Sequence, residues 1–195
     1  MFKSFAILVF GVKMPKPHLI TELLHDHKVA SIKNSSNFVS KHICRRIDFS
    51  KNLTIIEYGP GTGALTKSIL KFMNEGSKIV AIETNKILSG YLKELGDERL
   101  IVVNDNVLNV ENILNKLKIS KVDYIISGIP FSMISRDDKN KILEKSKSIL
   151  SKDGKLLVYQ VRKGIEKDLG NYFKIIDKKF EIRNIPPLVI FECGK

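Results

Sequence analysis

The sequence predicts an α/β fold: a Rossmann-like, doubly wound sheet of seven strands, mostly parallel with one antiparallel strand, and helices on both faces. Short apolar runs rich in β-branched residues alternate with helical patterns along most of the chain, which is typical of parallel sheets. The last two runs are joined by a turn with Pro186 and Pro187, which accounts for the antiparallel strand. A glycine-rich turn after the first run completes the pattern.

Length and composition fit one soluble domain with a substantial core, at 195 residues. The formal net charge of +12 favours a polyanionic partner without choosing between RNA and an anionic membrane surface. Cys44 and Cys193 lack disulfide or metal-ligand spacing, so we expect a reducing cytoplasm and no metal. No apolar run reaches the ~20 residues of a membrane-spanning helix.

Residues 1–50 are predicted to form an N-terminal helical segment. The apolar run Phe5–Val12 lies between two lysines, and helical spacing is shared by Phe2, Phe5, Ala6, Val9 and Phe10. It is either an interfacial helix that dips into lipid, or a packing arm or unstructured extension. Helical patterns follow between His18 and His42, and the four histidines, which lack ligand spacing, are expected at the surface. We interpret the segment as a cap: a membrane interface, or the place where substrate enters.

The first strand of the sheet is expected at Leu53–Ile56. It ends at Glu57 and leads into Gly59, Gly61 and Gly63 before a helix begins. Glycines at such a turn let the backbone reach positive φ and let a ligand approach the main chain. The free N–H groups at the start of the helix suit an anionic or electron-rich group.

The later elements follow from the same alternation. An Asp153-Gly154 turn is expected between the last long helix and the fifth strand. Strands are expected at Lys78–Ile82, Leu100–Asn104, Val122–Ile126, Lys155–Val161, Phe173–Arg183 and Leu188–Glu192, with helices at Ala64–Met73 and from about Arg136 to Leu150.

Acidic side chains follow the second and third strands. Glu83 comes 20 residues after Gly63, and a carboxylate at that place can accept both hydroxyls of a ribose. Asp105 and Asn106 follow the third strand and suit the exocyclic amine of an adenine, although N-D-N is also common turn chemistry.

The stretch E-Y-G-P-G-T-G resembles the first motif of class I S-adenosylmethionine-dependent methyltransferases, and the resemblance extends from residue 53 to about residue 160. It implies that S-adenosylmethionine lies across the carboxyl ends of strands one to four, in a domain of residues 51–195. The cofactor-binding residues that it implies are Glu57, Tyr58, Gly59, Gly61, Thr62, Gly63, Glu83, Thr84, Asp105, Asn106 and Ser127.

The segment after the fourth strand, S-G-I-P-F, is where the substrate class is decided. Its I-P-F ending is similar to the N-I/L-P-Y/F motif of the rRNA adenine dimethyltransferases. In those enzymes the first side-chain amide accepts a hydrogen bond from the amine that is methylated. Gly128 stands at that place here and has no side chain to offer.

Four motifs in order resemble the small bacterial phospholipid N-methyltransferases, which convert phosphatidylethanolamine towards phosphatidylcholine. They are V-A-S-I-K-N-S-S-N-F, E-Y-G-P-G-T-G-A-L-T, I-S-G-I-P-F and the tail R-N-I-P-P-L-V-I-F, in which Leu188 replaces the usual alanine. If the sixth strand is parallel to the first five, this tail lies on the cofactor rim. The substrate-binding residues that these motifs imply are Ser36, Phe38, Arg183, Asn184 and Pro186. Arg162 and Arg183 are rim cations that suit a lipid phosphate, or else they lie on a solvated face.

The reaction implied is an in-line attack of an amine nitrogen on the sulfonium methyl, which mainly requires positioning and an unprotonated amine. Within the segment Gly128, Ile129, Pro130 and Phe131, the first two carbonyls would orient the nitrogen, and the phenylalanine would pack against a methylated cation. Tyr159 is a candidate proton acceptor, or else a core aromatic. Three hypotheses follow: a phosphatidylethanolamine N-methyltransferase, peripheral on the inner membrane face; an RNA or small-amine methyltransferase; and a non-catalytic module that binds lipid or RNA.

Overall fold

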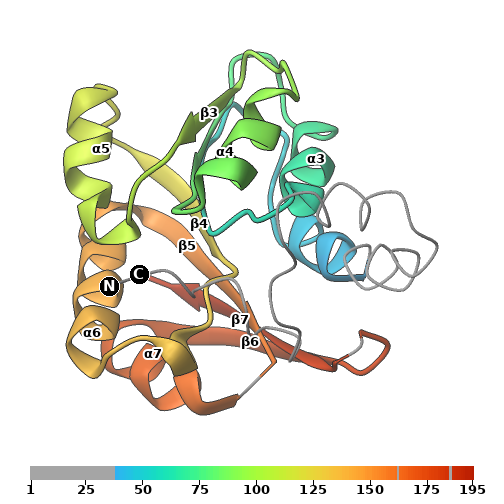
Figure 1. Ribbon diagram of the computed structural model, residues 1–195. Coiled ribbons are helices and arrows are strands. Elements are labelled where there is room, and N and C mark those ends of the chain that lie inside the picture. The colour runs from blue at the N-terminus through green and yellow to red at the C-terminus, as the bar shows by residue number, and fades with distance from the viewer. Residues whose placement is uncertain (1–37, 162, 185) are drawn as a thin grey trace.

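The computed structural model describes residues 38–161, 163–184 and 186–195, and within them the chain forms one seven-stranded sheet (Figure 1). The strand order is β3-β2-β1-β4-β5-β7-β6. The strands are β1 Thr54–Tyr58, β2 Lys78–Ile82, β3 Leu100–Val103, β4 Val122–Ser127, β5 Leu150–Gln160, β6 Lys174–Glu181 and β7 Leu188–Gly194.

Strand direction confirms the predicted architecture. Strands β1 to β5 pair in parallel, whereas β7 pairs antiparallel with both β5 and β6. Since β7 lies between them, β6 runs in the same direction as β5. The carboxyl ends of six strands therefore meet at one edge of the sheet, which we call the rim.

Helices cover both faces of the sheet (Figure 1). One apolar cluster joins α5, α6 and α7 to one face, and another joins α3 and the helix at residues 38–44 to the opposite face. The helices are α3 Ala64–Leu70, α4 Lys86–Lys93, α5 Val110–Lys116, α6 Arg136–Ile149 and α7 Glu166–Tyr172, with short 3-10 turns η1 Val107–Asn109, η2 Phe131–Met133 and η3 Lys163–Ile165.

The start of β5 differs from the expected one. The strand begins at Leu150, directly after α6, and the predicted Asp153-Gly154 turn lies inside it. Val122 of β4 pairs with Leu150, but Tyr124 pairs with Lys155. The additional residues on the β5 side bulge out of the ladder, so a turn sequence is accommodated without ending the strand.

The helix at residues 38–44 is part of the domain core. Val39, Ile43 and Ile47 are buried in the cluster that contains Ile55 of β1 and Ile69 of α3. The described part of the predicted N-terminal segment therefore packs on the sheet. Residues 1–37, with the apolar arm and Ser36, lie outside the described residues, as does Arg162.

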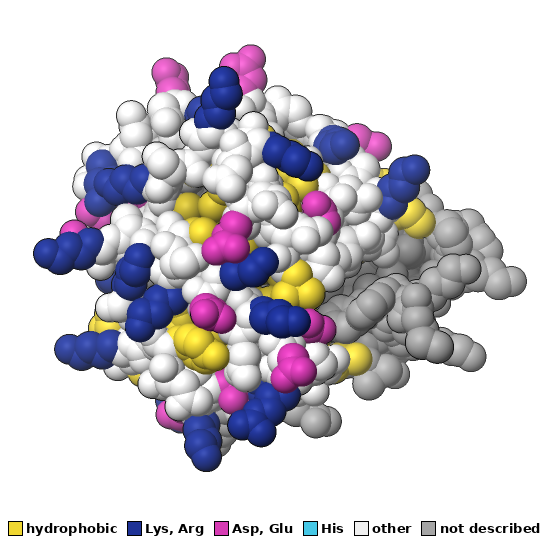
Figure 2. Space-filling model, turned by 90° about the vertical axis from the view of Figure 1, so that its left-hand side faces the viewer, with side chains coloured by type: hydrophobic (Ala, Val, Ile, Leu, Met, Phe, Trp, Pro, Cys, Tyr) yellow, Lys and Arg dark blue, Asp and Glu magenta, His cyan; other side chains and the backbone are white. Residues whose placement is uncertain are grey.

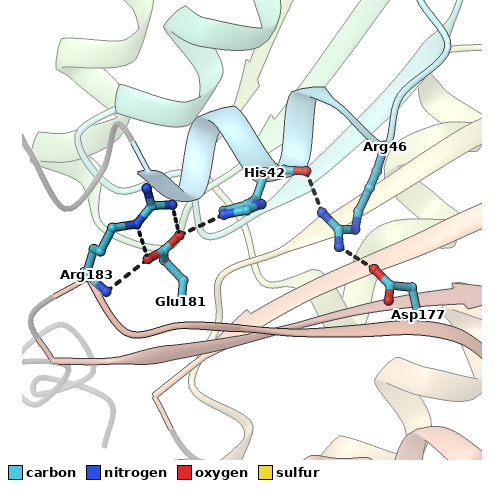
Figure 3. A network of polar contacts seen from close by, with 5 residues as sticks. All are labelled: His42, Arg46, Asp177, Glu181 and Arg183. Atoms are coloured by element: carbon cyan, nitrogen blue, oxygen red, sulfur yellow. Dashed lines mark hydrogen bonds and ion pairs between the residues drawn. The ribbon is translucent and has the colours of Figure 1, made fainter.

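A polar network ties the same helix to β6 (Figure 3). His42 Nε2 lies 2.7 Å from Glu181 Oε2, and the Arg183 guanidinium donates to both oxygens of Glu181 at 2.8 and 2.6 Å. Arg46 donates to Asp177 farther back along β6. Hydrogen bonds from Arg183 are the main reason that the pKa of Glu181 falls to about 2. His42, expected at the surface, is instead half-buried at the helix–strand contact, because Glu181 offers it a carboxylate partner.

The positive charge does not gather into one patch on the face that α5, α6 and α7 cover. Basic side chains are interspersed there with acidic ones and small apolar areas (Figure 2). Lys139 of α6 pairs with Asp168, and Lys145 lies 3.6 Å from Glu111. This face therefore offers no continuous basic track for a nucleic-acid backbone. Among the helices of the described residues, none has the length and apolar character to cross a membrane.

Candidate active site

The turn between β1 and α3 is shaped by three glycines with positive φ: 67° at Gly59, 59° at Gly61 and 76° at Gly63. A Cβ at Gly59 would lie 2.9 Å from Ile129, and one at Gly63 would lie 2.6 Å from Leu92. At Gly61 nothing lies within 4 Å of that position. The first and third glycines thus permit packing, whereas the second borders open space where a ligand can approach the backbone.

Glu83 lies directly against this turn. Its Oε2 accepts a hydrogen bond from the Gly61 N–H at 3.1 Å, and its Oε1 accepts one from the Asn85 N–H at 2.8 Å. The Asn104 side chain donates to the Glu83 backbone carbonyl at 2.7 Å, which joins the ends of β2 and β3. The structure therefore brings together the glycine turn and the acid that the sequence placed at one ligand.

Glu57 is a fully buried acid behind the turn. The Thr66 hydroxyl donates to its Oε2 at 2.6 Å, but Oε1 has no hydrogen-bond partner among the described residues. Burial raises the pKa of Glu57 to about 7, with the charge of Glu83 a further cause. A buried acceptor without a partner is costly, and a cationic group of a ligand would relieve that cost.

Two adjacent predicted residues have structural partners. Asp105 Oδ1 accepts from the Asn106 N–H at 2.6 Å and from the Asn109 amide at 2.8 Å, and Asn106 Oδ1 accepts from the Leu108 N–H at 2.9 Å. Asn106 thereby caps η1. The N-D-N stretch does form turn chemistry, and its use for an adenine amine stays a prediction.

Other cofactor predictions lie along the same rim. Thr62 and Thr84 are exposed there, and the Tyr58 hydroxyl points to the far face, 3.2 Å from Ser146 Oγ. Ser127 ends β4 beside Tyr58 and is fully buried, with no partner for its Oγ among the described residues.

The predicted catalytic segment begins at Gly128, whose N–H donates to the Tyr58 carbonyl at 3.1 Å. Ile129 packs over Gly59 and so joins the ends of β4 and β1. Pro130 is half-buried, and Phe131 is 3% exposed within the α5–α7 apolar cluster. The ring of Phe131 thus has a core position, and its contact with a methylated cation stays a prediction.

Tyr159 of β5 fills the space beside Gly128. A Cβ at Gly128 would lie 2.2 Å from the tyrosine Oη and 2.6 Å from its Cζ, far inside contact distance. Burial, with the Glu57 charge as second cause, raises the pKa of Tyr159. The phenol therefore stays protonated near neutral pH, which disfavours the predicted role as proton acceptor and leaves a hydroxyl for hydrogen bonding.

The tail residues meet at the rim end of β6. The Arg183 guanidinium stacks on Phe38, 4.4 Å from the ring centre. The Asn184 amide is buried and donates to the Pro186 carbonyl at 2.6 Å, so it stabilises the β6–β7 turn. The sequence did not indicate Glu181 or His42. Glu181 holds the Arg183 guanidinium, and its contact with His42 holds the helix at residues 38–44 against β6.

Comparisons with known proteins agree with this geometry. The class is that of the class I S-adenosylmethionine-dependent methyltransferases. The sheet order, the glycine turn and the acid after β2 all fit it. The family model for ribosomal RNA adenine dimethylase matches residues 32–175, and the chain belongs to that family. The protein is therefore an enzyme whose cofactor is S-adenosylmethionine.

Its relatives differ in substrate. An ornithine lipid N-methyltransferase from Singulisphaera acidiphila is 24% identical over 172 residues, covering 87% of this chain and 90% of the relative. Ribosomal RNA small subunit methyltransferase A from Mycoplasma mycoides subsp. mycoides is 38% identical over 109 residues, covering 51% of this chain and 39% of the relative. The chain thus spans well under half of the matched RNA enzyme.

Solved structures match at the level of the fold. A methyltransferase from Aquifex aeolicus has a TM-score of 0.65 at 14% identity, covering 92% of this chain and 98% of that one. The N-methyltransferase NodS from Bradyrhizobium japonicum WM9 has a TM-score of 0.68 at 9% identity, covering 83% and 97%.

Proposed function

We propose that the enzyme methylates the amine of a membrane lipid, with phosphatidylethanolamine or its methylated intermediates as the main candidates. The observation that carries the proposal is the contact between Gly128 and Tyr159. The amide that begins the N-I/L-P-Y/F motif of the adenine dimethyltransferases has no room here, because the phenol occupies its place. The lipid-modifying relative that covers nearly the whole chain supports the same substrate class.

The cofactor would lie at the end of the rim formed by β1 and β2, which we call the cofactor end. Open space at Gly61 admits a ligand against the backbone, and the Glu83 carboxylate beside it can accept ribose hydroxyls. The Oε1 of Glu57, which lacks a partner, suits the ammonium of the methionine part. When bound, S-adenosylmethionine supplies an activated methyl group on a sulfonium.

The segment after β4, together with Tyr159 of β5, would position the lipid nitrogen. The carbonyls of Gly128 and Ile129 can accept hydrogen bonds from an amine. The Tyr159 hydroxyl lies beside Gly128, where a Cβ would be. The ammonium proton must leave before attack, and water can take it. The phenol, which is protonated near neutral pH because its pKa is raised, can then orient the neutral amine. Positioning, rather than a strong base, is the contribution of this segment.

The alternative is an RNA adenine methyltransferase. The family model and the 38% identity to an RNA enzyme over half of the chain support it. Against it stands Gly128, where Tyr159 leaves no room for a side-chain amide.

Methyl transfer from labelled S-adenosylmethionine would test the proposal. The substrates are phosphatidylethanolamine vesicles, ornithine lipid vesicles and small-subunit rRNA. We expect label in an amino lipid and none in RNA. Label in RNA adenines, with neither lipid modified, would replace the proposal with the alternative.

A further inference from the structure

A row of exposed apolar side chains stands at the rim, at the ends of neighbouring strands. Met133 follows β4, Val161 follows β5 and Ile182 follows β6, and their exposed fractions are 39%, 39% and 77%. Pro187, also exposed, precedes β7, which lies between β5 and β6. At ~4.8 Å between strands, the row extends about 15 Å from β4 to β6.

The row borders the proposed amine site. Val161 lies two residues beyond Tyr159 on β5, which is about 7 Å along the strand. Met133 ends the 3-10 turn that begins at Phe131, directly after the Gly128 segment. Met133 and Val161 therefore follow the two segments that hold Gly128 and Tyr159.

Two basic residues next to the row have acidic neighbours. Arg183, next to Ile182, is paired with Glu181, and Arg136 after η2 is followed by the exposed Asp137. Local charge therefore does not explain why large apolar side chains are exposed here. Grouped exposed apolar residues indicate a contact with another apolar phase or partner, and the chain's net charge of +12 is complementary to an anionic leaflet.

We propose that this row docks the rim onto an anionic lipid bilayer, with Ile182 and Val161 inserted among the headgroups beside the site opening. The proposal rests on the proposed lipid function and specifies the orientation in which the enzyme meets its substrate. A lipid amine in the headgroup layer then reaches Gly128 and Tyr159 while its acyl chains stay in the bilayer. Because the apolar insertion is indifferent to salt, binding falls only in part at high ionic strength.

Ile182→Glu tests the docking surface, with Ile176→Glu as the matched control. Ile176 lies on the same strand and is 52% exposed, but it stands near the opposite end of β6, about 20 Å away. Partition of the full chain onto phosphatidylethanolamine–phosphatidylglycerol vesicles is measured by sedimentation. We expect Ile182→Glu to weaken partition about tenfold and Ile176→Glu to leave it unchanged.

Activity on two forms of the lipid separates docking from chemistry. Ile182→Glu should lose activity on vesicles but keep it on a short-chain, water-soluble phosphatidylethanolamine. Equal partition of both variants and the wild type, or wild-type binding to structured RNA in place of vesicles, would overturn the docking surface. If the wild type binds vesicles through Ile182 yet methylates neither lipid form, the docking surface stands and the proposed function fails.

Discussion

The two ends of the rim are held together by different means. At β1 and β2, a backbone turn with positive φ meets the carboxylate of Glu83, and the contacts are hydrogen bonds to main-chain N–H groups. At β4 to β6, the rim is made of side chains from distant parts of the sequence, such as Tyr159 beside Gly128 and Arg183 beside Phe38. Backbone geometry therefore defines the proposed cofactor end at β1 and β2, and side-chain pairs define the proposed substrate end at β4 to β6.

Glu57→Gln addresses the cofactor end and carries the largest expected effect. The folded-state pKa of about 7 exceeds the ordinary value of 4.5, so the folded protein binds more protons between these values. Its free energy of unfolding therefore falls as pH rises from 4.5 to 7, on the order of 3 kcal/mol from this group. Urea unfolding at several pH values should show that slope in the wild type and lose it in Glu57→Gln. A slope that persists in the variant would mean that other groups cause it.

Gly128→Asn tests the substrate end by restoring the amide of the adenine enzymes. Because a Cβ there clashes with both Oη and Cζ of Tyr159, we expect turnover to fall about 100-fold, with cofactor affinity unchanged. The same clash should lower the free energy of unfolding, and adding Tyr159→Leu should recover part of that loss. Tyr159→Phe should not, since Cζ remains. A single variant with normal lipid turnover would refute the importance of this contact.

Glu83→Ala should lower cofactor affinity, the quantity that Gly128→Asn is expected to leave unchanged. Loss of a charged acceptor at the glycine turn is expected to weaken S-adenosylmethionine binding about 30-fold, roughly 2 kcal/mol. Calorimetry measures it, with Glu111→Ala on α5 as control. Unchanged affinity would break the assignment of this end of the rim to the cofactor.

Tyr159→Phe gives the smallest expected change. Removal of the hydroxyl should lower kcat about tenfold without changing cofactor affinity, because the contact matters when the amine is aligned. The half-buried Tyr172 of α7 provides the control Tyr172→Phe. If Tyr159 were instead the proton acceptor, its loss would also abolish the pH dependence of kcat, and the profile distinguishes the two roles.

The glycine turn and the strands around it could be predicted from the sequence better than the β4–β6 end of the rim, because they depend on local backbone geometry. Lys78–Ile82 forms β2 as expected, and the glycines have the expected positive φ. Such features depend on local composition and on the rule that parallel strands share one rim. Function at the level of a methyltransferase came from the resemblance of the glycine-turn stretch to the first motif of that class.

The substrate end depends on pairs that local patterns do not reveal. His42 and Glu181 are 139 residues apart, and the fit of Tyr159 beside Gly128 depends on the register of β4 against β5. That register includes a bulge, which the sequence indicated only as a turn. The row of Met133, Val161 and Ile182 likewise becomes visible only when strand order is known.

The outer edge of β6 has a consequence for crowding at a surface. In the described part of the chain, β6 pairs with β7 on one side only, and it carries Lys174, Lys178 and Lys179. Lysines on an edge strand discourage another copy from adding its own strand. If the enzyme docks on a leaflet as proposed, its copies meet far more often than in solution. Repulsion between these edges would then keep neighbours as separate, freely diffusing molecules. Activity per enzyme should then stay constant as surface density rises.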